Sequence, residues 1–523
     1  MTHPHTDNGK TGNGRVVLVG AGPGDPGLIT VAGMEALKAA DAVVFDALAN
    51  PVLLDAAPAS AERYDVGKRA KFHKLTQDQT NDLLVTLAKQ GKRVVRLKGG
   101  DPYLFGRGAE EAAFCARHGV RCDVVPGVTA GLAAPATAGI PVTHRKVAST
   151  VTIITGHEDP TKGETSIDYQ ALANLIKAGG TACFYMGVGR LQAICDSLTD
   201  CGLARTTPAA LIQWGTLPAQ RHAVGTLDNI KQKVDQANLG SPAIIVVGEV
   251  AAIDEPGLDY FTNRPLFGQR IIVTRTRQQA SGLRLKLESL GAEVLEAPTI
   301  RIVEPGPEDR QAFGDAIARL ADYDAVVFTS ANAVHALADK LDALGLDSRA
   351  LAGLHVSCIG GSTAAVLRER FAIAADFVPK RSVAEAFVDE LLSATSMRGK
   401  RVLLPRADIA RPTLPTKLRA AGCVVDEITV YETTIAEGLP DDVLAALRAG
   451  EADWVTFTSS STVRNLVELL GNEAGLLGQC KLASIGPQTS ATMRDSKLDI
   501  ATQATQHDLD GLIKALVACQ QGE

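Results

Sequence analysis

Residues 16–27 read VVLVGAGPGDPG, and this stretch decides the fold of the first half of the chain. An apolar run leads directly into a loop with glycines at positions 20, 22, 24 and 27. Glycine lets backbone N–H groups approach a ligand closely and adopts positive φ values without strain. The stretch therefore predicts a strand that ends in a ligand-binding loop.

A second predicted strand followed by a glycine-rich loop occurs further along the chain. Residues 93–97, RVVRL, predict a strand, and the loop KGGDPYLFGRG follows it. A third turn, VVPGVT at 124–129, opens the small-residue run AGLAAPATAG, which permits close approach either of a ligand or of another backbone. Two glycine-rich loops after two strands favour a ligand site more strongly than either loop alone.

The segments around these loops predict alternating strands and helices. We expect helices over 31–40, with Thr30 as N-cap, and over 83–90, and a strand over 42–45 that ends at Asp46. A carboxylate at that position belongs either to a ligand site or to a solvated loop. Further apolar runs over 182–187, 209–215 and 243–248 end in glycine. The first half is thus predicted to be an α/β domain over 15–253, after a flexible polar tail over 1–14.

Length and composition limit the class of protein. A chain of 523 residues predicts two or three domains, and 46% hydrophobic with 21% charged residues is typical of globular proteins. We expect no membrane span, because glycine or charge interrupts every long apolar run. We expect a cytoplasmic protein, because the N-terminus has no apolar signal region. The nine cysteines lie singly, which predicts reduced thiols and no metal site.

The charge distribution disfavours a nucleic-acid partner. Residues 1–255 carry 25 basic and 25 acidic side chains, and the remainder carries 28 and 34, so neither half is basic. One basic cluster stands out: GKRAKFHK at 67–74 contains Lys68, Arg69, Lys71 and Lys74 without an acid. It is either a solvated turn or a seat for an anionic ligand.

The second half repeats itself after a linker over 254–269. RIIVTR at 270–275 matches RVLLPR at 401–406, YDAVVFTSANAV at 323–334 matches ADWVTFTSSSTV at 452–463, and SCIGGSTAAVL at 357–367 matches ASIGPQTSATM at 483–493. We therefore predict, over 270–520, two α/β lobes of about 125 residues with a cleft between them. The extended stretches 298–305 and 427–434 occupy matching places and are the predicted hinge crossings.

The opening loop does not fit the common nucleotide motifs. A dinucleotide fingerprint, G-x-G-x-x-G, requires a third glycine where this chain has Asp25, and Pro23 lies inside the turn. The complete P-loop pattern does not occur in the sequence. NAD and nucleoside triphosphates are therefore disfavoured as ligands of this loop.

Residues 15–253 instead resemble the S-adenosylmethionine-dependent tetrapyrrole methylases. The matching segments, in order, are VGAGPGDPGLIT, GKR, RLKGGDPYLFGRGAEE, VVPGVTA, GIPVTHR, FYMG and SPAIIVVG. Within that family the chain is most similar to the uroporphyrinogen-III C-methyltransferases, which methylate C-2 and C-7 to give precorrin-2. The resemblance implies S-adenosylmethionine as cofactor, bound by Pro23, Gly99, Gly100, Asp101, Leu104, Thr129, Ala130, Met186 and Gly215.

The resemblance also implies catalytic roles that suit the chemistry. Asp46 would accept the proton that leaves the methylated pyrrole carbon, as a general base. Lys68 would be a catalytic donor or a substrate anchor, the alternative being an ordinary surface lysine. The substrate of such an enzyme carries many carboxylates, which a basic cluster would bind. Arg69 and Lys71 are therefore predicted to bind substrate, and the segment 144–146 is a further candidate.

Residues 265–515 resemble uroporphyrinogen-III synthase, through PLFGQRIIVTR, the paired FTS and IG turns, the two-lobed repeat and VYETT. Such an enzyme closes hydroxymethylbilane with inversion of ring D and needs no cofactor. The resemblance makes Tyr431 a candidate proton donor to the departing hydroxyl. The predicted substrate-binding residues are Thr329, Ser330, Asn332, Thr363, Thr458, Ser459, Ser460 and Thr489. Ser330 and Ser459 also precede helical patterns, so N-capping explains them equally well.

The sequence thus predicts a bifunctional tetrapyrrole enzyme, toward sirohaem or cobalamin, that forms a homodimer through its methyltransferase domain. Two alternatives stay open. The first half could methylate another corrin intermediate or RNA, although its neutral charge balance disfavours RNA. The second half could sense a tetrapyrrole without converting it.

Overall fold

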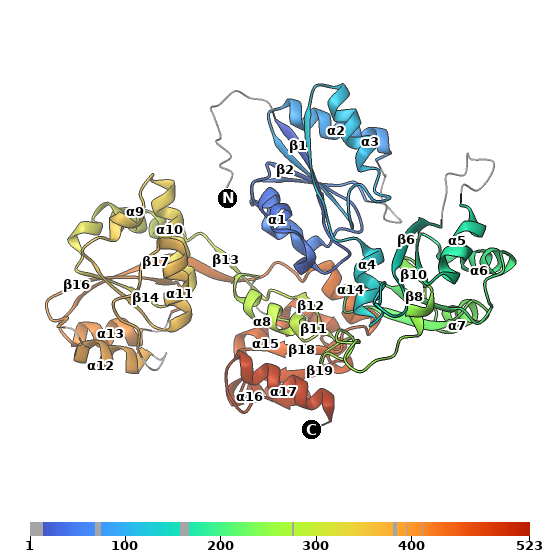
Figure 1. Ribbon diagram of the computed structural model, residues 1–523. Coiled ribbons are helices and arrows are strands. Elements are labelled where there is room, and N and C mark those ends of the chain that lie inside the picture. The colour runs from blue at the N-terminus through green and yellow to red at the C-terminus, as the bar shows by residue number, and fades with distance from the viewer. Residues whose placement is uncertain are drawn as a thin grey trace. The chain divides into compact units, whose positions relative to one another are not determined.

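The computed structural model describes residues 14–67, 75–156, 167–274, 277–379, 384–394, 396–410 and 412–522 (Figure 1). These residues form four five-stranded sheets. The chain divides into two compact units, Met1–Ile271 with Arg284–Val294 and Val517–Glu523, and Ile272–Leu283 with Leu295–Leu516. Among the described helices, none has the length and apolar character that a membrane span requires.

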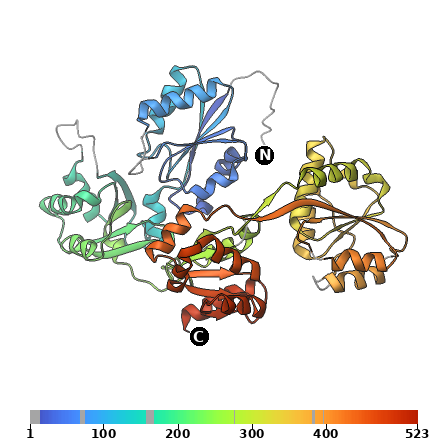
Figure 2. The same ribbon diagram turned by 180° about the vertical axis from the view of Figure 1, so that it is seen from behind.

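The first sheet is parallel and carries helices on both faces (Figure 2). Alternate residues of a strand point to opposite faces. Val17 and Val19 accordingly pack under α1, whereas Val16 and Leu18 pack under α2 and α3. In spatial order the strands are β3 (Glu62–Asp65), β2 (Ala42–Phe45), β4 (Arg93–Lys98), β1 (Arg15–Gly20) and β5 (Arg121–Val125), and the helices are α1 (Val31–Lys38), α2 (Gln77–Lys89) and α3 (Gly108–Arg117).

Most local predictions for this sheet are confirmed. Helix α1 begins as expected, with the Thr30 hydroxyl accepting the Gly33 N–H at 3.1 Å. The prediction was wrong about the start of α2, which begins six residues before residue 83. Thr76 and Gln79 form a capping box there, in which each side chain pairs with the other's backbone N–H.

The second sheet is mixed, with β6 and β7 parallel and the other pairs antiparallel. Its spatial order is β6 (Thr150–Thr155), β7 (Gly180–Tyr185), β10 (Ala243–Val247), β8 (Pro208–Gln213) and β9 (Arg221–Thr226), with α5 (Tyr169–Lys177), α6 (Leu191–Asp200) and α7 (Ile230–Gln236). Helix α4 (Ala130–Thr137) follows β5 and packs on β7 and β10. It therefore links the two sheets of the first unit.

The remaining two sheets belong to the repeated half of the chain. One has the order β12 (Glu293–Glu296), β11 (Arg270–Val273), β18 (Trp454–Phe457), β19 (Lys481–Ser484), β20 (Thr502–Gln503). The other has the order β13 (Ile300–Val303), β17 (Val424–Ile435), β16 (Arg401–Ala407), β14 (Ala325–Phe328), β15 (His355–Cys358). The helices are α8 (Arg277–Ser289), α9 (Pro307–Ala318), α10 (Ala331–Ala343), α11 (Gly361–Phe371), α12 (Ala384–Ala394), α13 (Thr413–Ala420), α14 (Asp441–Ala449), α15 (Ser460–Leu470), α16 (Pro487–Asp495) and α17 (Leu509–Gln521).

The two lobes do not coincide with the two sequence copies. Strand β11 opens the first copy but lies beside β18 of the second copy, and β16 opens the second copy but lies beside β14 of the first. Each lobe therefore combines the opening strands of one copy with the later strands of the other. The sequence repeat predicts two similar lobes correctly, but it does not show which segments share a sheet.

The stretches predicted as hinge crossings pair with each other. Strand β13 runs antiparallel to the end of β17, with Ile300 opposite Ile435 and Val303 opposite Glu432 (Figure 1). The crossing segments therefore form a two-stranded ribbon rather than two independent loops.

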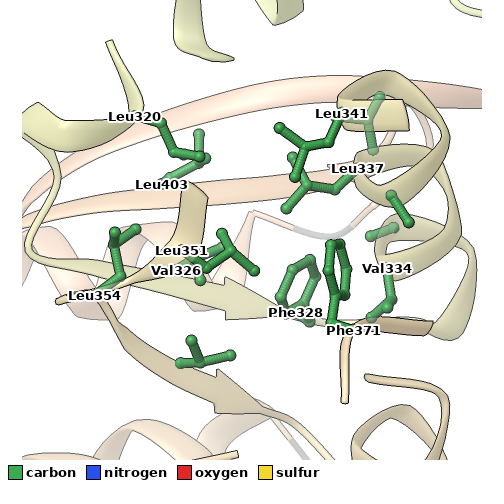
Figure 3. Close-up of a cluster of buried hydrophobic side chains, with 14 of the residues drawn as sticks. Leu320, Val326, Phe328, Val334, Leu337, Leu341, Leu351, Leu354, Phe371 and Leu403 are labelled. Atoms are coloured by element: carbon green, nitrogen blue, oxygen red, sulfur yellow. The ribbon is translucent and has the colours of Figure 1, made fainter. Parts of the chain in front are cut away.

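The lobe between these crossings has a complete core of its own. The side chains over one face of its sheet, among them Phe328, Leu337, Phe371 and Leu403, pack into a single cluster (Figure 3). A second cluster, which includes Phe387 and Leu404, covers the other face. Every buried member of both clusters lies between residues 313 and 431.

We predict that residues 299–436, expressed alone, fold cooperatively. This fragment keeps both faces of the β13-β17-β16-β14-β15 sheet, whereas residues 270–400, one sequence copy, lack β16 and β17, two of the five strands. Thermal unfolding followed by circular dichroism should show a cooperative transition for 299–436 and none for 270–400. A cooperative transition for 270–400 would contradict this account of the lobes.

Candidate functional site

The three glycine-containing loops of the first sheet meet backbone to backbone. Gly22 and Gly100 form an antiparallel bridge, in which the Gly100 N–H donates to the Gly22 oxygen at 2.7 Å. A Cβ added to Gly20 would lie 2.5 Å from the Gly127 Cα, and one added to Gly127 would lie 2.3 Å from the Gly100 oxygen. Only glycine fits at these contacts. The loops after β1, β4 and β5 therefore form one cradle at the carboxyl ends of parallel strands.

Asp101 joins the second and third loops through its carboxylate. One oxygen accepts the Gly127 N–H at 2.9 Å, and the other accepts the Tyr103 N–H at 2.8 Å. Both oxygens thus have backbone partners before any ligand is considered. Asp101 shapes the cradle, and its predicted contact with a cofactor stays a prediction.

The turn after β8 approaches the cradle from the second sheet. The Thr216 hydroxyl accepts the Asp25 N–H at 3.1 Å, so it contacts the loop that contains Pro23. A Cβ on Gly215 would lie 2.2 Å from the Cβ of Ala134 in α4. The structure therefore brings the predicted cofactor residues Pro23 and Gly215 into neighbouring segments.

Five non-glycine residues around the cradle have left-handed backbone conformations. The φ values are 55° for Phe105, 59° for Arg107, 55° for Met186, 50° for Trp214 and 72° for Thr216. Such residues cost roughly 1–3 kcal/mol each and concentrate at functional sites. The side chains of Phe105, Met186 and Trp214 are also exposed, although they are large and apolar. Strain and exposed apolar surface occur together here, as at a ligand site.

Asp46 lies at the end of β2, beside the second loop. Its Oδ1 accepts the backbone N–H groups of Leu48 at 3.2 Å, Ala49 at 3.2 Å and Gly99 at 3.3 Å. Its Oδ2 lies 3.7 Å from a guanidinium nitrogen of Arg96. The carboxylate is therefore held in one orientation, with Oδ1 on backbone N–H groups and Oδ2 facing Arg96.

A buried ionic network lies under Asp46. The Oε1 atom of fully buried Glu111 accepts from Arg96 at 3.3 Å, Lys98 at 3.1 Å and Gln77 at 3.1 Å, whereas its Oε2 atom has no hydrogen-bond partner among the described residues. Burial lowers the pKa of Lys98, the charge of Arg96 adds to this effect, and Glu111 opposes it. Arg96 and Lys98 are two residues apart in β4, so their side chains lie on the same face of the sheet. The Glu111 carboxylate therefore contacts both cations.

The basic segment predicted to bind substrate lies outside the described residues. This concerns Lys68, Arg69 and Lys71. Their predicted roles stay predictions. The remaining predicted cofactor residues Leu104, Thr129 and Ala130 lie in the second loop and at the start of α4.

In the lobe with β14, the predicted synthase residues gather at the carboxyl ends of the strands. Ser330 caps α10, accepting the Ala333 N–H at 3.1 Å, and its hydroxyl also lies 3.0 Å from the buried hydroxyl of Tyr431. Thr329 directly follows β14, and Asn332 and Thr363 are buried in the first turns of α10 and α11. Ser330 therefore both caps α10 and contacts Tyr431.

The equivalent residues of the other lobe gather in the same way. Ser459 caps α15, accepting the Thr462 N–H at 3.3 Å, and Ser460 donates to the Gln488 oxygen at 3.2 Å. Thr458 directly follows β18, and Thr489 is buried in the first turn of α16. Each lobe thus presents hydroxyl groups beside two helix N-termini, an arrangement that favours carboxylate ligands.

Sequence reasoning missed three residues of the first site. Tyr185 directly precedes the predicted Met186, and Arg96 and Glu111 belong to the buried network. The signal for Arg96 was a charge inside an apolar strand. Tyr185 had a weaker signal, a polar aromatic at the end of an apolar run.

These features define an α/β enzyme with small-molecule sites at the carboxyl ends of parallel strands. Comparison with known proteins is more specific. The family model for Tetrapyrrole (Corrin/Porphyrin) Methylases matches residues 15–231, and the model for Uroporphyrinogen-III synthase HemD matches residues 281–514. The chain therefore belongs to the tetrapyrrole methylases through its first half and to the uroporphyrinogen-III synthases through its second.

Individual relatives agree with this division. The chain is 37% identical to the porphyrin biosynthesis protein HemD of Ruminiclostridium josui, over 87% of this chain and 88% of the relative. It is 49% identical to an S-adenosyl-L-methionine-dependent uroporphyrinogen III methyltransferase of Methanosarcina barkeri, over 46% of this chain and 94% of the relative. A solved uroporphyrin-III C-methyltransferase of Thermus thermophilus, complexed with S-adenyl homocysteine, is 36% identical over 45% of this chain and 98% of that chain, with a TM-score of 0.38.

We predict that Gly127→Ala destabilises the first unit by about 2 kcal/mol. The added methyl group would collide with backbone atoms, which cannot move aside as a flexible side chain can. Denaturant unfolding of the full chain measures the effect. Gly189→Ala is the matched control, because a Cβ there meets nothing within 4 Å. A loss as small as that of the control would show that the loops are not in contact.

Proposed function

We propose that this chain is a bifunctional tetrapyrrole biosynthesis enzyme. Its second half cyclises hydroxymethylbilane to uroporphyrinogen III, and its first half methylates that product at C-2 and C-7 to give precorrin-2, toward sirohaem and cobalamin. The two family matches carry this proposal, because they assign consecutive reactions to one chain. The relatives over each half support the same two activities.

The cradle fits S-adenosylmethionine as the cofactor of the first half. Close backbone loops suit its amino-acid and ribose groups, and the exposed apolar side chains of Phe105, Met186 and Trp214 suit its adenine ring. We propose that Pro23, Gly99, Gly100, Asp101, Leu104, Thr129, Ala130, Met186 and Gly215 hold it. When bound, it supplies a methyl group on an already activated sulfonium. The chain then has chiefly to orient the methyl group toward the acceptor carbon.

The proton released by the pyrrole carbon requires a base. We propose Asp46 for this role, because three backbone N–H groups fix its Oδ1, and its Oδ2, 3.7 Å from Arg96, is the oxygen that would take the proton. Lys68, Arg69 and Lys71 would bind the substrate carboxylates, Lys68 also as a catalytic donor.

In the synthase half, hydroxyl groups and helix N-termini bind the substrate carboxylates and fold the linear chain. Thr329, Ser330, Asn332, Thr363, Thr458, Ser459, Ser460 and Thr489 are the proposed contacts. We propose that Tyr431 gives a proton to the departing hydroxyl, with Ser330 at 3.0 Å orienting its phenol group. Excluding water from the cleft favours rearrangement over side reactions.

We further propose that the chain forms a homodimer in the cytoplasm. The resemblance to tetrapyrrole methylases supports a homodimer through the first half, which light scattering of the purified chain would test. The neutral charge of that half argues against a nucleic-acid partner. We place the protein in the cytoplasm with no membrane partner, which fractionation of expressing cells would test.

The purified chain should convert hydroxymethylbilane and S-adenosylmethionine to precorrin-2 without another enzyme. Without S-adenosylmethionine, the reaction should stop at uroporphyrinogen III, as resolved by chromatography of the oxidised isomers. Formation of only the spontaneous type I isomer would exclude the synthase activity.

In the same assay, Tyr431→Phe should slow ring closure, because the variant lacks the phenol that would donate the proton. An unchanged rate of ring closure would remove that role.

Replacement of the proposed base should affect methyl transfer alone. Asp46→Asn keeps an oxygen for the backbone N–H groups but cannot accept the proton, so kcat for methylation should fall by roughly 100-fold or more. Formation of uroporphyrinogen III by the same variant is the internal control and should not change. A methylation rate within a few-fold of the parent chain would show that Asp46 is not the base.

A further inference from the structure

Tyr185, at the end of β7, connects three segments of the proposed cofactor site. Its hydroxyl lies 2.5 Å from the hydroxyl of Thr129 and also accepts the backbone N–H of Gly131. Its ring lies 5.3 Å from the ring of Phe105 in the second loop, at an interplanar angle of 59°. Met186 follows it directly in the chain. One side chain from the second sheet thus contacts the loops of the first.

Helix α4 begins in an unusual way, and Tyr185 accounts for it. Thr129 is at the N-cap position, but its own side chain makes no capping hydrogen bond. The Tyr185 hydroxyl instead accepts the N–H of Gly131 in the first turn. A Cβ on Gly131 would lie 2.7 Å from this hydroxyl oxygen, so glycine is needed for the approach. The cap of α4 is therefore supplied from another sheet.

The donors and acceptors around the Tyr185 hydroxyl follow from this arrangement. Burial raises the pKa of Tyr185, so the phenol keeps its single proton at neutral pH. The Gly131 N–H can only donate, so the phenol oxygen accepts there. Either hydroxyl can donate in the contact between Tyr185 and Thr129. In both cases the contact fixes the side chain of Thr129, which borders the cradle.

We infer that Tyr185 is a positioning residue for S-adenosylmethionine, which orients Thr129 and the start of α4 toward the bound cofactor. This inference rests on the proposed methyltransferase function. The side chain acts through Thr129 and the backbone, so its loss should weaken cofactor binding more than it slows methyl transfer at saturating cofactor.

The test is the affinity of the full-length chain for S-adenosylhomocysteine, measured by calorimetry. Tyr185→Phe keeps the ring beside Phe105 and removes the hydroxyl, and Kd should rise about ten-fold because Thr129 and the first turn of α4 are no longer held in their binding positions. In steady-state assays KM for S-adenosylmethionine should rise similarly, with kcat changed less than two-fold. Tyr64→Phe, which removes a hydroxyl bonded to Glu62 on the edge strand β3, is the control and should not alter Kd.

The partner residue provides a second measurement. Thr129→Val should weaken binding to a similar extent, and Thr129→Ser, which keeps the hydroxyl, should retain affinity. Combined with Tyr185→Phe, Thr129→Val should add little further loss, because both remove the same contact. If Tyr185→Phe does not fold, Gly131→Ala replaces it, because the added Cβ would lie 2.7 Å from the Tyr185 hydroxyl and displace it; Kd should rise in that variant as well, and an unchanged Kd would overturn the inference.

The outcomes separate this inference from the proposed function. If the parent chain binds S-adenosylhomocysteine and Tyr185→Phe or Thr129→Val binds it equally well, Tyr185 has no positioning role. If both variants lose stability but keep their affinity, the tyrosine is only structural, which also overturns the inference. If the parent chain itself does not bind, the methyltransferase function fails and this inference falls with it.

Discussion

Direct contact between backbone segments is the constraint on which the first half depends. Gly20, Gly100 and Gly127 come from three loops that are distant in sequence. A Cβ on Gly20 or Gly127 would collide with the backbone of another of these loops, whereas Gly100 is needed for its positive φ. The parallel sheet makes this meeting possible, because β1, β4 and β5 are neighbours whose carboxyl ends lie at one edge. Asp101 then fixes the second loop to the third. The ligand surface is thus mainly backbone, and its shape is set by the sheet.

A buried network of charged side chains lies beside this cradle. Arg96 and Lys98 are both buried on one strand, and burying two positive charges would cost much desolvation free energy without an acid between them. Glu111 supplies that acid, and Arg96 reaches on toward Asp46. A buried ion pair of this kind contributes little net stability compared with an apolar core. Its effect is to fix where the charged groups lie around the proposed base.

Sequence patterns predicted what short-range physics determines. Thr30, Ser330 and Ser459 are helix caps because a hydroxyl before a helix satisfies its free N–H groups. The glycine loops and the two-lobed repeat were predicted for similar reasons. The pairing of β11 with β18, and the cap that Tyr185 gives to α4, depend on residues far apart in sequence. No local pattern encodes such contacts, so the structure was needed to find them.

The exchange of strands between the two sequence copies has a consequence for the order of folding. Thr274 at the end of β11 bonds to Thr456, which is 182 residues later in the chain. The lobe that begins first during synthesis therefore cannot complete its sheet until almost the whole chain has been made. The lobe inserted within it contains only nearer contacts and has its whole core available earlier. Because closing a long loop carries an entropic cost, the inserted lobe should fold first and shorten the effective loop that the outer lobe must close.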